Sequence, residues 1–363
     1  MQITAAVLRT SDGPYALERV ELAEPRPDEV LVRIVGVGMC HTDVIPRAAD
    51  TMSPPPIITG HEGSGVVEAV GSDVTRIAVG DHVVLSYDSC GSCRRCAAGN
   101  PAYCETMLVR NLLGRRMDLT TGVIDADGVE VASRWFGQSS FATHCLATER
   151  NAVAVDAALP LEKLGPLGCG IQTGAGTVLV ALDVQPGASI VIFGAGAVGL
   201  AAVMAAKVAE AATIVAVDLH PHRLDLAREL GATHVVDGAT DDVLAQVMAV
   251  TGAGADHAID TTGVPSVMLT ALACTSLGGS VGLVGVQTGD LTLDALALVG
   301  KTVIGILEGS ADPQTFIPRM IELWRSGRFP FDRLLEEFPL DQINEAEHAS
   351  LTGRVVKPVL RPA

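Results

Sequence analysis

Residues 189–209 of this 363-residue chain read SIVIFGAGAVGLAAVMAAKVA. An apolar run suited to a buried strand leads into a glycine-rich turn, and an alanine-rich run suited to a helix follows. Gly194, Gly196 and Gly199 form a G-x-G-x-x-G pattern, which is informative because it joins a predicted strand to a predicted helix. The first glycine permits the tight turn, the second lets a pyrophosphate approach the backbone, and the third lets the helix pack on the strand. This stretch therefore predicts a dinucleotide-binding unit.

The alternation of strand-like and helix-like segments continues after this stretch. Residues 213–218 form a second predicted strand, and a helix is expected to begin near Pro221 and to end at Gly231. Further strands are predicted, with helices between them, at residues 234–236, 257–260, 280–284 and 301–305. Six such strands are typical of a doubly wound parallel sheet, so an α/β fold is predicted.

Asp218 ends the second predicted strand. A carboxylate at this point of a dinucleotide-binding unit accepts hydrogen bonds from the adenosine ribose hydroxyls and repels a 2′-phosphate. A solvent-facing aspartate at a strand end is the plainer alternative, but the glycine motif at the right distance favours cofactor binding. The sequence therefore predicts NAD(H) rather than NADP(H).

Residues 1–165 differ in character, because short apolar runs alternate there with Gly and Pro turns. VLVRIVGVG, which begins at Val30, has the period of two that is typical of a half-buried strand. The tail after residue 308 loses the strand–helix alternation and is expected to return to this domain. We predict a β-rich domain of residues 1–165 and 309–363 and a dinucleotide-binding domain of residues 166–308.

Composition excludes several classes of partner. The chain has 25 Lys and Arg against 42 Asp and Glu, a formal net charge of −17, so neither nucleic acid nor an anionic membrane is an expected partner. The longest apolar stretch, residues 190–206, is short for a membrane span and is interrupted by the three motif glycines. The N-terminus lacks the pattern of a secretory signal, so a cytoplasmic location is predicted.

A group of four cysteines predicts a metal site. CGSCRRCAAGNPAYC places Cys90, Cys93, Cys96 and Cys104 at C-x2-C-x2-C-x7-C spacing. Four thiolates can surround one Zn²⁺ tetrahedrally and leave no open position, so a structural zinc is predicted. An iron–sulfur cluster and two disulfides are the alternatives, and the second is disfavoured in an intracellular chain.

Three other segments carry groups that can bind a metal or act in catalysis. Cys40, His41, Thr42 and Asp43 follow one predicted strand, His61 and Glu62 lie in GHEG, and Cys169 lies in GCG just before the second domain. Each group alone has an ordinary explanation as a core or surface residue. The second histidine of an H-E-x-x-H protease site is absent.

Taken together, these motifs resemble the zinc-containing medium-chain alcohol dehydrogenases. The resemblance covers the whole chain and rests, in order, on CHTD, GHEGSGVVEAVG, GDHVV, the four-cysteine segment, GCGIQTGAG, GAGAVG and Asp218. It implies a GroES-like catalytic domain beside a Rossmann domain, two Zn²⁺ per chain, NAD(H), and the reversible oxidation of a small-molecule alcohol to an aldehyde.

The resemblance also implies roles for individual residues of the catalytic site. Cys40, His61 and Cys169 are expected to hold the catalytic zinc, with Glu62 as a carboxylate that can transiently contact the metal. Asp43 is expected to orient His61, and Thr42 to take the alcohol proton. Many relatives carry a relay histidine where this chain has Ile45, so the last step of proton release differs here.

Other implied roles concern the cofactor. His41 and Lys357 match residues that face the pyrophosphate, and Arg223 matches a basic residue beside the adenosine ribose. Thr173 and Val198 match positions that flank the nicotinamide. A solvated surface position is the alternative for Arg223 and Lys357.

The predicted substrate pocket has Ser86 and Tyr87 on one side and Trp135 and Phe136 on the other. Aromatic residues are only 3% of the chain, so two adjacent ones favour a pocket wall over core packing. Aromatic walls suit flat or unsaturated substrates, and the motifs look most like aryl (benzyl) and allylic alcohol dehydrogenases. The alternatives are an aliphatic alcohol dehydrogenase, a thiol-adduct formaldehyde dehydrogenase and, more remotely, a non-catalytic protein that binds NAD and zinc. Relatives pair through a sheet edge, so a homodimer or homotetramer is expected.

Overall fold

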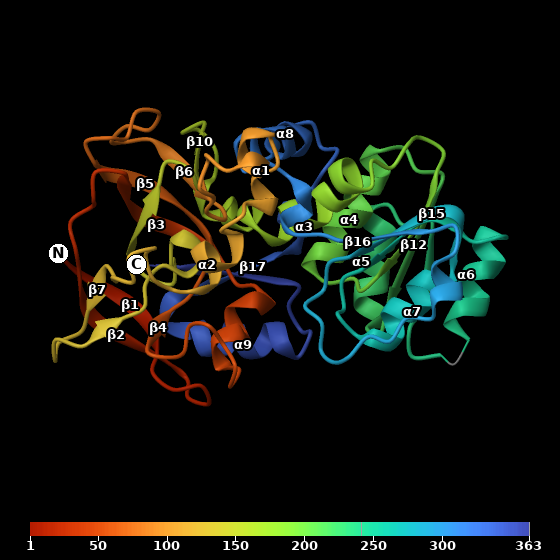
Figure 1. Cartoon of the computed structure of the whole chain (residues 1–363), viewed down its shortest axis with the longest axis horizontal. Coiled ribbons are helices and arrows are strands. Elements are labelled where there is room, and N and C mark those ends of the chain that lie inside the picture. The colour runs from red at the N-terminus through yellow and green to blue at the C-terminus, as the bar shows by residue number, and fades with distance from the viewer. Residues whose placement is uncertain (241, 363) are drawn as a thin grey trace. The chain divides into compact units, whose positions relative to one another are not determined.

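The computed structural model describes residues 1–240 and 242–362, so Ala363, the end of the predicted tail, lies outside the described residues. The chain forms two compact units, which are described separately. The first unit contains Met1–Cys169, Asp312–Pro318 and Asp332–Ala363, and the second contains Gly170–Ala311 and Arg319–Phe331. Both can be followed along the chain in Figure 1.

The first unit is built from two sheets. One sheet has the strand order β4-β1-β2-β7-β8, and the other has the order β10-β6-β5-β3-β18-β17, with β9 also paired to β3. Its strands are β1 (Gln2–Leu8), β2 (Tyr15–Leu22), β3 (Glu29–Gly38), β4 (Ile57–Ile58), β5 (Glu62–Val70), β6 (His82–Leu85), β7 (Val123–Ile124), β8 (Glu130–Val131), β9 (His144–Thr148), β10 (Ala152–Val155), β17 (Leu335–Pro339) and β18 (Lys357–Arg361). The short helices α1 (Arg94–Ala97) and α2 (Met107–Leu112) and the longer α9 (Ile343–Leu351) accompany them. The predicted β-rich character is thus confirmed.

Strand β3 is the centre of this unit. It pairs antiparallel with β5, β9 and β18, and apolar side chains of all these strands are buried. The register places Gly38 opposite Glu62 and Val359 opposite Gly38. The C-terminal end of β3 therefore lies beside the start of β5 and the start of β18.

The second unit is a six-stranded parallel sheet with the order β13-β12-β11-β14-β15-β16. Its strands are β11 (Ser189–Phe193), β12 (Thr213–Asp218), β13 (His234–Asp237), β14 (Ala255–Asp260), β15 (Thr275–Leu283) and β16 (Thr302–Gly305). Helices α3 (Gly170–Gly176), α4 (Ala197–Val208), α5 (Pro221–Leu230), α6 (Val243–Thr251) and α7 (Pro265–Ala273) precede or connect these strands. All six predicted strands are present, and the order reverses between β11 and β14, where doubly wound sheets bind ligands.

The division of the tail differs from the prediction, which assigned residues 309–363 entirely to the β-rich domain. Helix α8 (Pro313–Arg325) begins in the first unit, but Arg319–Phe331 belongs to the second. Within the second unit the Trp324 and Phe331 rings pack edge to face at 5.2 Å, and the Arg328 side chain donates to the Val208 carbonyl. The second contact joins residues far apart in the chain, so no local sequence pattern predicts it.

Cys145 and Cys274 are buried in the apolar cores of the first and second units, which agrees with a packing role. Across residues 1–240 and 242–362, no helix combines the length and hydropathy needed to cross a bilayer.

Candidate metal centres and dinucleotide pocket

The first candidate centre joins four residues from distant parts of the first unit. Donor atoms of Cys40, His61, Glu62 and Cys169 all lie within 4.8 Å of one another. Nε2 of His61 is 3.2 Å from Sγ of Cys169, and His61 is fully buried. The hydrogen bond from Cys169, followed by that from His61, lowers the pKa of the Cys40 thiol well below its usual range despite burial. The group can therefore present thiolate and imidazole donors to one cation.

Strand pairing explains this convergence. Cys40 follows the end of β3, and His61 directly precedes β5, so the β3–β5 register brings both residues to the same end of the sheet. Cys169 follows the short turn Gly165–Gly168. A side chain at Gly168 would meet the Leu85 carbonyl oxygen at 2.0 Å, so only glycine allows this turn to lie so close to β6.

The carboxylate of Asp43 holds two residues of this centre, His61 and Cys40, by hydrogen bonds. Its Oδ1 accepts hydrogen bonds from the backbone N–H of Gly60 (2.9 Å) and from Nδ1 of His61 (2.8 Å), and its Oδ2 accepts one from the Cys40 N–H (3.1 Å). Asp43 is 1% exposed, so these bonds are shielded from water. Fixing the proton on Nδ1 leaves Nε2 as the nitrogen that could bind a metal and raises its basicity.

Lys357 has a position that the sequence did not predict. The solvated alternative is wrong, because the side chain is buried and Nζ lies 2.9 Å from Oε2 of Glu62, which is also buried. Nζ also donates to the Met39 carbonyl at 3.0 Å. Burial by itself lowers the pKa of Lys357, but the charges of Glu62 and Cys40 and the hydrogen bond to Glu62 together outweigh it, and the net direction is upward. The ammonium group therefore faces the carboxylate of the first centre, and its predicted contact with a pyrophosphate stays a prediction.

The residues around Cys40 vary in burial. Thr42 is half-buried, with Oγ1 3.7 Å from Sγ of Cys40. His41 is exposed at the start of the 3-10 helix His41–Arg47, and Ile45 is half-buried in the same helix. Thr42 is thus close to the donor set, whereas His41 points to solvent in the first unit.

The four predicted pocket residues are all buried in the first unit. The Phe136 ring stacks on the imidazole of His61 at 4.4 Å and 26°, and Trp135 packs edge to face on Phe136. Ser86 donates a 2.6 Å hydrogen bond to the Gly168 carbonyl, and Tyr87 belongs to the apolar core. The aromatic pair therefore lies against His61 of the first candidate centre as well as in the core.

The second candidate centre is local. Donor atoms of Cys90, Cys93, Cys96 and Cys104 lie within 4.8 Å of one another, and all four, which belong to the described residues, are free thiols. Backbone N–H groups point at the sulfurs, as from Cys93 to Cys90 at 3.3 Å. Hydrogen bonds from the backbone, led by that of Ser92, lower the pKa of Cys90 to about 6, while burial raises the pKa of Cys96 to about 12. Four thiols this close cannot all ionise without a cation between them.

The glycine motif lies between β11 and α4. Gly194 has φ 92°, and a side chain at Gly199 would meet the Gly194 carbonyl at 1.7 Å, so the turn and the close helix packing both require glycine. Among the described residues other than the immediate chain neighbours, no atom lies within 4 Å of the position that a Cβ of Gly196 would occupy. Gly196 is the N-cap of α4, and the first N–H groups of that helix have no partner within it, which leaves room and donors for a phosphate.

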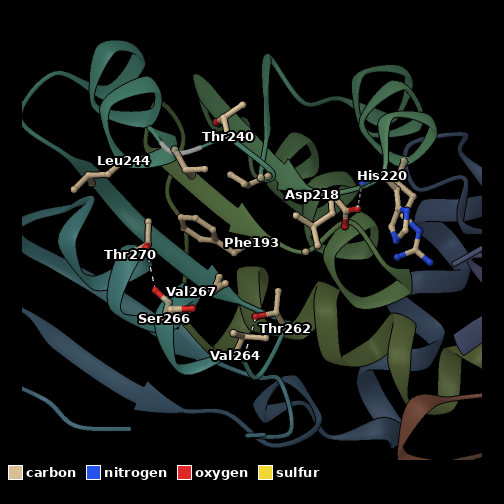
Figure 2. A pocket seen from close by; sticks show the side chains of 16 residues that line it. Phe193, Asp218, His220, Thr240, Leu244, Thr262, Val264, Ser266, Val267 and Thr270 are labelled. Carbon is tan, nitrogen blue, oxygen red and sulfur yellow. Dashed lines mark hydrogen bonds between the residues drawn. The ribbon is translucent and has the colours of Figure 1, made fainter. Parts of the chain in front are cut away.

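Beside the motif, the second unit contains a pocket of about 500 Å³. Figure 2 shows Asp218 next to His220 at one end and Leu244 and Thr270 at the other. Asp218 accepts hydrogen bonds from the N–H groups of Ala195 (2.6 Å) and His220 (2.8 Å), and Arg223 also lines the pocket. Apolar walls with polar groups at the ends suit the adenosine half of a dinucleotide.

Thr173 and Val198 lie outside this lining. Thr173 is in α3 and Val198 is at the start of α4. The two helices pack closely, since a side chain at Gly174 would meet the Val198 carbonyl at 2.0 Å. The structure therefore brings these two predicted residues into one neighbourhood of the second unit.

Replacement of Asp218 by glycine is expected to reduce the preference for NAD⁺ over NADP⁺ by at least about tenfold, because it removes the carboxylate that repels a 2′-phosphate. The ratio of kcat/KM for the two cofactors measures the change. Asp225→Gly, on the exposed side of α5, is the control and should leave the ratio unaltered. An unchanged ratio in the Asp218 variant would contradict the assignment.

Gln138 is a buried polar residue that the sequence analysis did not predict to belong to the site. Its side chain forms hydrogen bonds with the backbone of His61 and Gly63, on either side of Glu62. Its position next to a predicted pocket wall was the only signal in the sequence.

Comparisons with known proteins agree with this geometry. Residues 26–157 match the family model described as "Alcohol dehydrogenase GroES-like domain", and residues 197–325 match "Zinc-binding dehydrogenase". The chain is 50% identical over 361 residues to geraniol dehydrogenase of Castellaniella defragrans, with 98% of this chain and 96% of that protein covered. The structure of benzyl alcohol dehydrogenase from Acinetobacter calcoaceticus is similar, with a TM-score of 0.96, 43% identity and full coverage of both chains. An alcohol dehydrogenase zinc-binding domain protein from Burkholderia ambifaria has a TM-score of 0.96 at 48% identity, with 99% of each chain covered.

Proposed function

The chain belongs to the family of zinc-binding alcohol dehydrogenases, and from this premise we propose that it interconverts primary aromatic or allylic alcohols and their aldehydes with NAD(H). The observation that carries the proposal is the convergence of Cys40, His61 and Cys169 around one point, with Asp43 bonded to the far side of the imidazole. Two thiolates and one imidazole form the ligand set of an alcohol-oxidising zinc, with one position left for substrate.

The donor set fits Zn²⁺ because the pKa of the Cys40 thiol is lowered and the imidazole tautomer of His61 is fixed. When bound, zinc supplies Lewis acidity toward the alcohol oxygen. Two interactions of the chain itself orient the site: Asp43 forms a hydrogen bond with His61, and Lys357 forms an ion pair with Glu62. We assign receipt of the alcohol proton to Oγ1 of Thr42. Ile45 cannot carry a proton, so the last step of proton release depends on a group other than residue 45.

We propose a second zinc at the four-cysteine cluster, with a purely structural role because four sulfurs close the coordination shell. NAD(H) is the proposed cofactor of the second unit, on the strength of the open space at Gly196 and the carboxylate of Asp218. The reduced thiols at both centres suit a reducing compartment, which makes the cytoplasm the proposed location.

Cys96→Ser is expected to remove the structural zinc and to lower the thermal midpoint of the holoenzyme, because metal binding at such a cluster contributes directly to folding. Differential scanning fluorimetry and the zinc content per chain report the change. Arg95→Gln, at an exposed position of the same segment, is the control. A Cys96 variant that keeps wild-type stability but loses turnover would contradict the structural role.

The substrate class rests on two considerations. Relatives that share 50% and 43% of their residues with the chain are called geraniol and benzyl alcohol dehydrogenases. The aromatic rings of Trp135 and Phe136 lie against His61, and aromatic surfaces suit flat, unsaturated substrates.

The test is the appearance of NADH absorbance with benzyl alcohol, geraniol and ethanol, each with and without a zinc chelator. Chelator-sensitive turnover of the first two at far higher kcat/KM than ethanol is the expected result. Preference for ethanol would indicate an aliphatic enzyme, and turnover of formaldehyde only with an added thiol would indicate a thiol-adduct enzyme. Absence of all turnover in zinc-loaded protein would overturn the proposed activity.

We also propose that the chain forms a homo-oligomer through an edge patch of the second unit, defined by Leu277, Leu293, Leu296 and Val299. All four side chains are exposed, Leu277 to 79% and Leu296 to 76%, beside the edge strand β16. Such clusters on a surface indicate an interface, and an open edge strand can pair with a second copy.

Leu296→Glu is expected to shift the protein from a dimer or tetramer toward smaller species, because a charge in the patch opposes burial. Light scattering after size-exclusion chromatography measures the mass. Leu219→Glu, at an exposed position on the same unit, is the control. An unchanged mass in the Leu296 variant would place the interface elsewhere.

A further inference from the structure

We propose that the side-chain amide of Gln138 is a positioning residue for the catalytic zinc, which it serves by holding the backbone that carries His61 and Glu62. The inference rests on the proposed function, since it assumes a zinc at Cys40, His61 and Cys169. Gln138 belongs to a buried strap of residues 135–140 that crosses this backbone.

The amide uses its hydrogen-bonding capacity on three segments. Nε2 donates to the His61 carbonyl at 2.9 Å and to the Ser86 carbonyl at 3.0 Å. Oε1 accepts from the Gly63 N–H at 3.1 Å and from the Ser140 hydroxyl at 2.7 Å. Gln138 is fully buried, so water cannot replace any of these bonds. The amide thus clamps the chain immediately before and after Glu62.

The clamp reaches a second metal-binding segment through Ser86. While the Ser86 carbonyl accepts from Gln138, the Ser86 hydroxyl donates to the Gly168 carbonyl at 2.6 Å. Gly168 directly precedes Cys169. One chain of hydrogen bonds therefore connects the backbone of His61 with that of Cys169 without passing through the metal.

The strap itself is held in an unfavourable backbone conformation. Phe136 and Ser139 have φ of 51° and 58°, and Gly137 between them has 69°. Non-glycine residues occupy this region only where surrounding contacts impose it, and such residues concentrate at functional sites. Here the contacts are with the His61 segment, because the Ser140 N–H donates to the Gly60 carbonyl at 2.7 Å.

The conformation of the strap has a direct consequence for His61. It turns the Phe136 ring onto the imidazole at 4.4 Å while Gln138 holds the carbonyl of the same residue. Asp43 fixes the Nδ1 edge of that imidazole. Backbone, ring face and ring edge of His61 are thus each held by a different side chain, and Gln138 is the one that holds the backbone.

The experiment compares Gln138→Met with Asn111→Leu in the zinc-loaded chain. Both changes replace a buried amide by an apolar side chain of similar size, and Asn111 bonds to Asp88 and Met107 rather than to the His61 segment. Thermal midpoint, the rate of zinc release to a chelator and the visible spectrum after cobalt substitution are measured for each. Both variants should lose stability, but only Gln138→Met should release the catalytic zinc about tenfold faster and shift the cobalt bands.

A Gln138→Met protein that loses stability yet matches the wild type in zinc release and cobalt spectrum would overturn the inference. Should this variant not fold, Ser140→Ala removes a single bond to Oε1 and should speed zinc release about fivefold, the equivalent of one neutral hydrogen bond. An unaltered release rate in that variant would equally overturn it. A wild-type chain that binds zinc only at the four-cysteine cluster would overturn the proposed function and this inference together.

Discussion

Lys357→Met is expected to destabilise the first unit by about 3–5 kcal/mol, because it leaves the buried Glu62 carboxylate without its counter-charge. Glu62 is 0% exposed and Lys357 is 2% exposed, so water cannot take over the role of the ammonium group. Nζ bonds to both carboxylate oxygens at 2.9 Å, and methionine supplies no donor. Denaturant unfolding, followed by Trp135 fluorescence in a Trp324→Phe background, measures the first unit, since the chain has two tryptophans.

The same substitution is expected to lower kcat at least about tenfold. Donor atoms of Glu62 and the three proposed zinc ligands lie within 4.8 Å of one another, so a carboxylate released from Lys357 can compete for the proposed substrate position. Lys357→Arg keeps the charge and is expected to retain most of the stability. Glu62→Gln combined with Lys357→Met should recover part of the loss, because the uncompensated charge is gone. A Lys357→Met protein as stable as the wild type would contradict the ion-pair role.

Asp43→Asn is expected to weaken retention of the catalytic zinc about 10- to 100-fold, with a comparable loss of activity. Three N–H donors surround the carboxylate, and an amide has only one oxygen to offer them. In either orientation the new NH₂ group faces a buried donor, which costs about 1–3 kcal/mol. The proton on Nδ1 of His61 is then no longer fixed by a charge. Zinc release to a chelator and kcat/KM measure the two effects.

Asp260→Asn provides the control for this prediction. Asp260 is also fully buried and accepts hydrogen bonds from the N–H groups of Thr262 and Gly263, but it lies in the second unit. This variant should lose stability and keep its zinc. Equal zinc release in both variants would show that Asp43 acts only through general stability.

Features that depend on one short segment of the chain could be predicted from the sequence. The strand 189–193, the glycine turn and the helix after it follow from a single stretch, because the φ of Gly194 and the close approach at Gly199 are properties of one short segment. The four-cysteine cluster is equally local, since its sulfurs lie on one loop. For such features, the spacing of residues along the chain directly determines where their side chains lie in space.

The first candidate centre could not be predicted from residue spacing alone. Cys40, His61 and Cys169 are far apart in the chain, and each alone has an ordinary explanation as a core residue. Their resemblance to a known motif order suggested the grouping, and the β3–β5 register explains it physically. No local rule predicts which end of which strand a distant cysteine will reach.

The positions of Lys357 and Gln138, which contact residues of that centre, depend on tertiary structure alone. Lys357 begins β18, whose pairing with β3 places Val359 opposite Gly38 and so carries the lysine to the Cys40 end of the sheet. Gln138 reaches His61 only because the strap folds against residues 58–63. From sequence, a lysine near the C-terminus and a glutamine in a loop are most simply surface residues. Burial of a charge or an amide depends on what packs around it, and that is a property of the assembled sheet rather than of any segment.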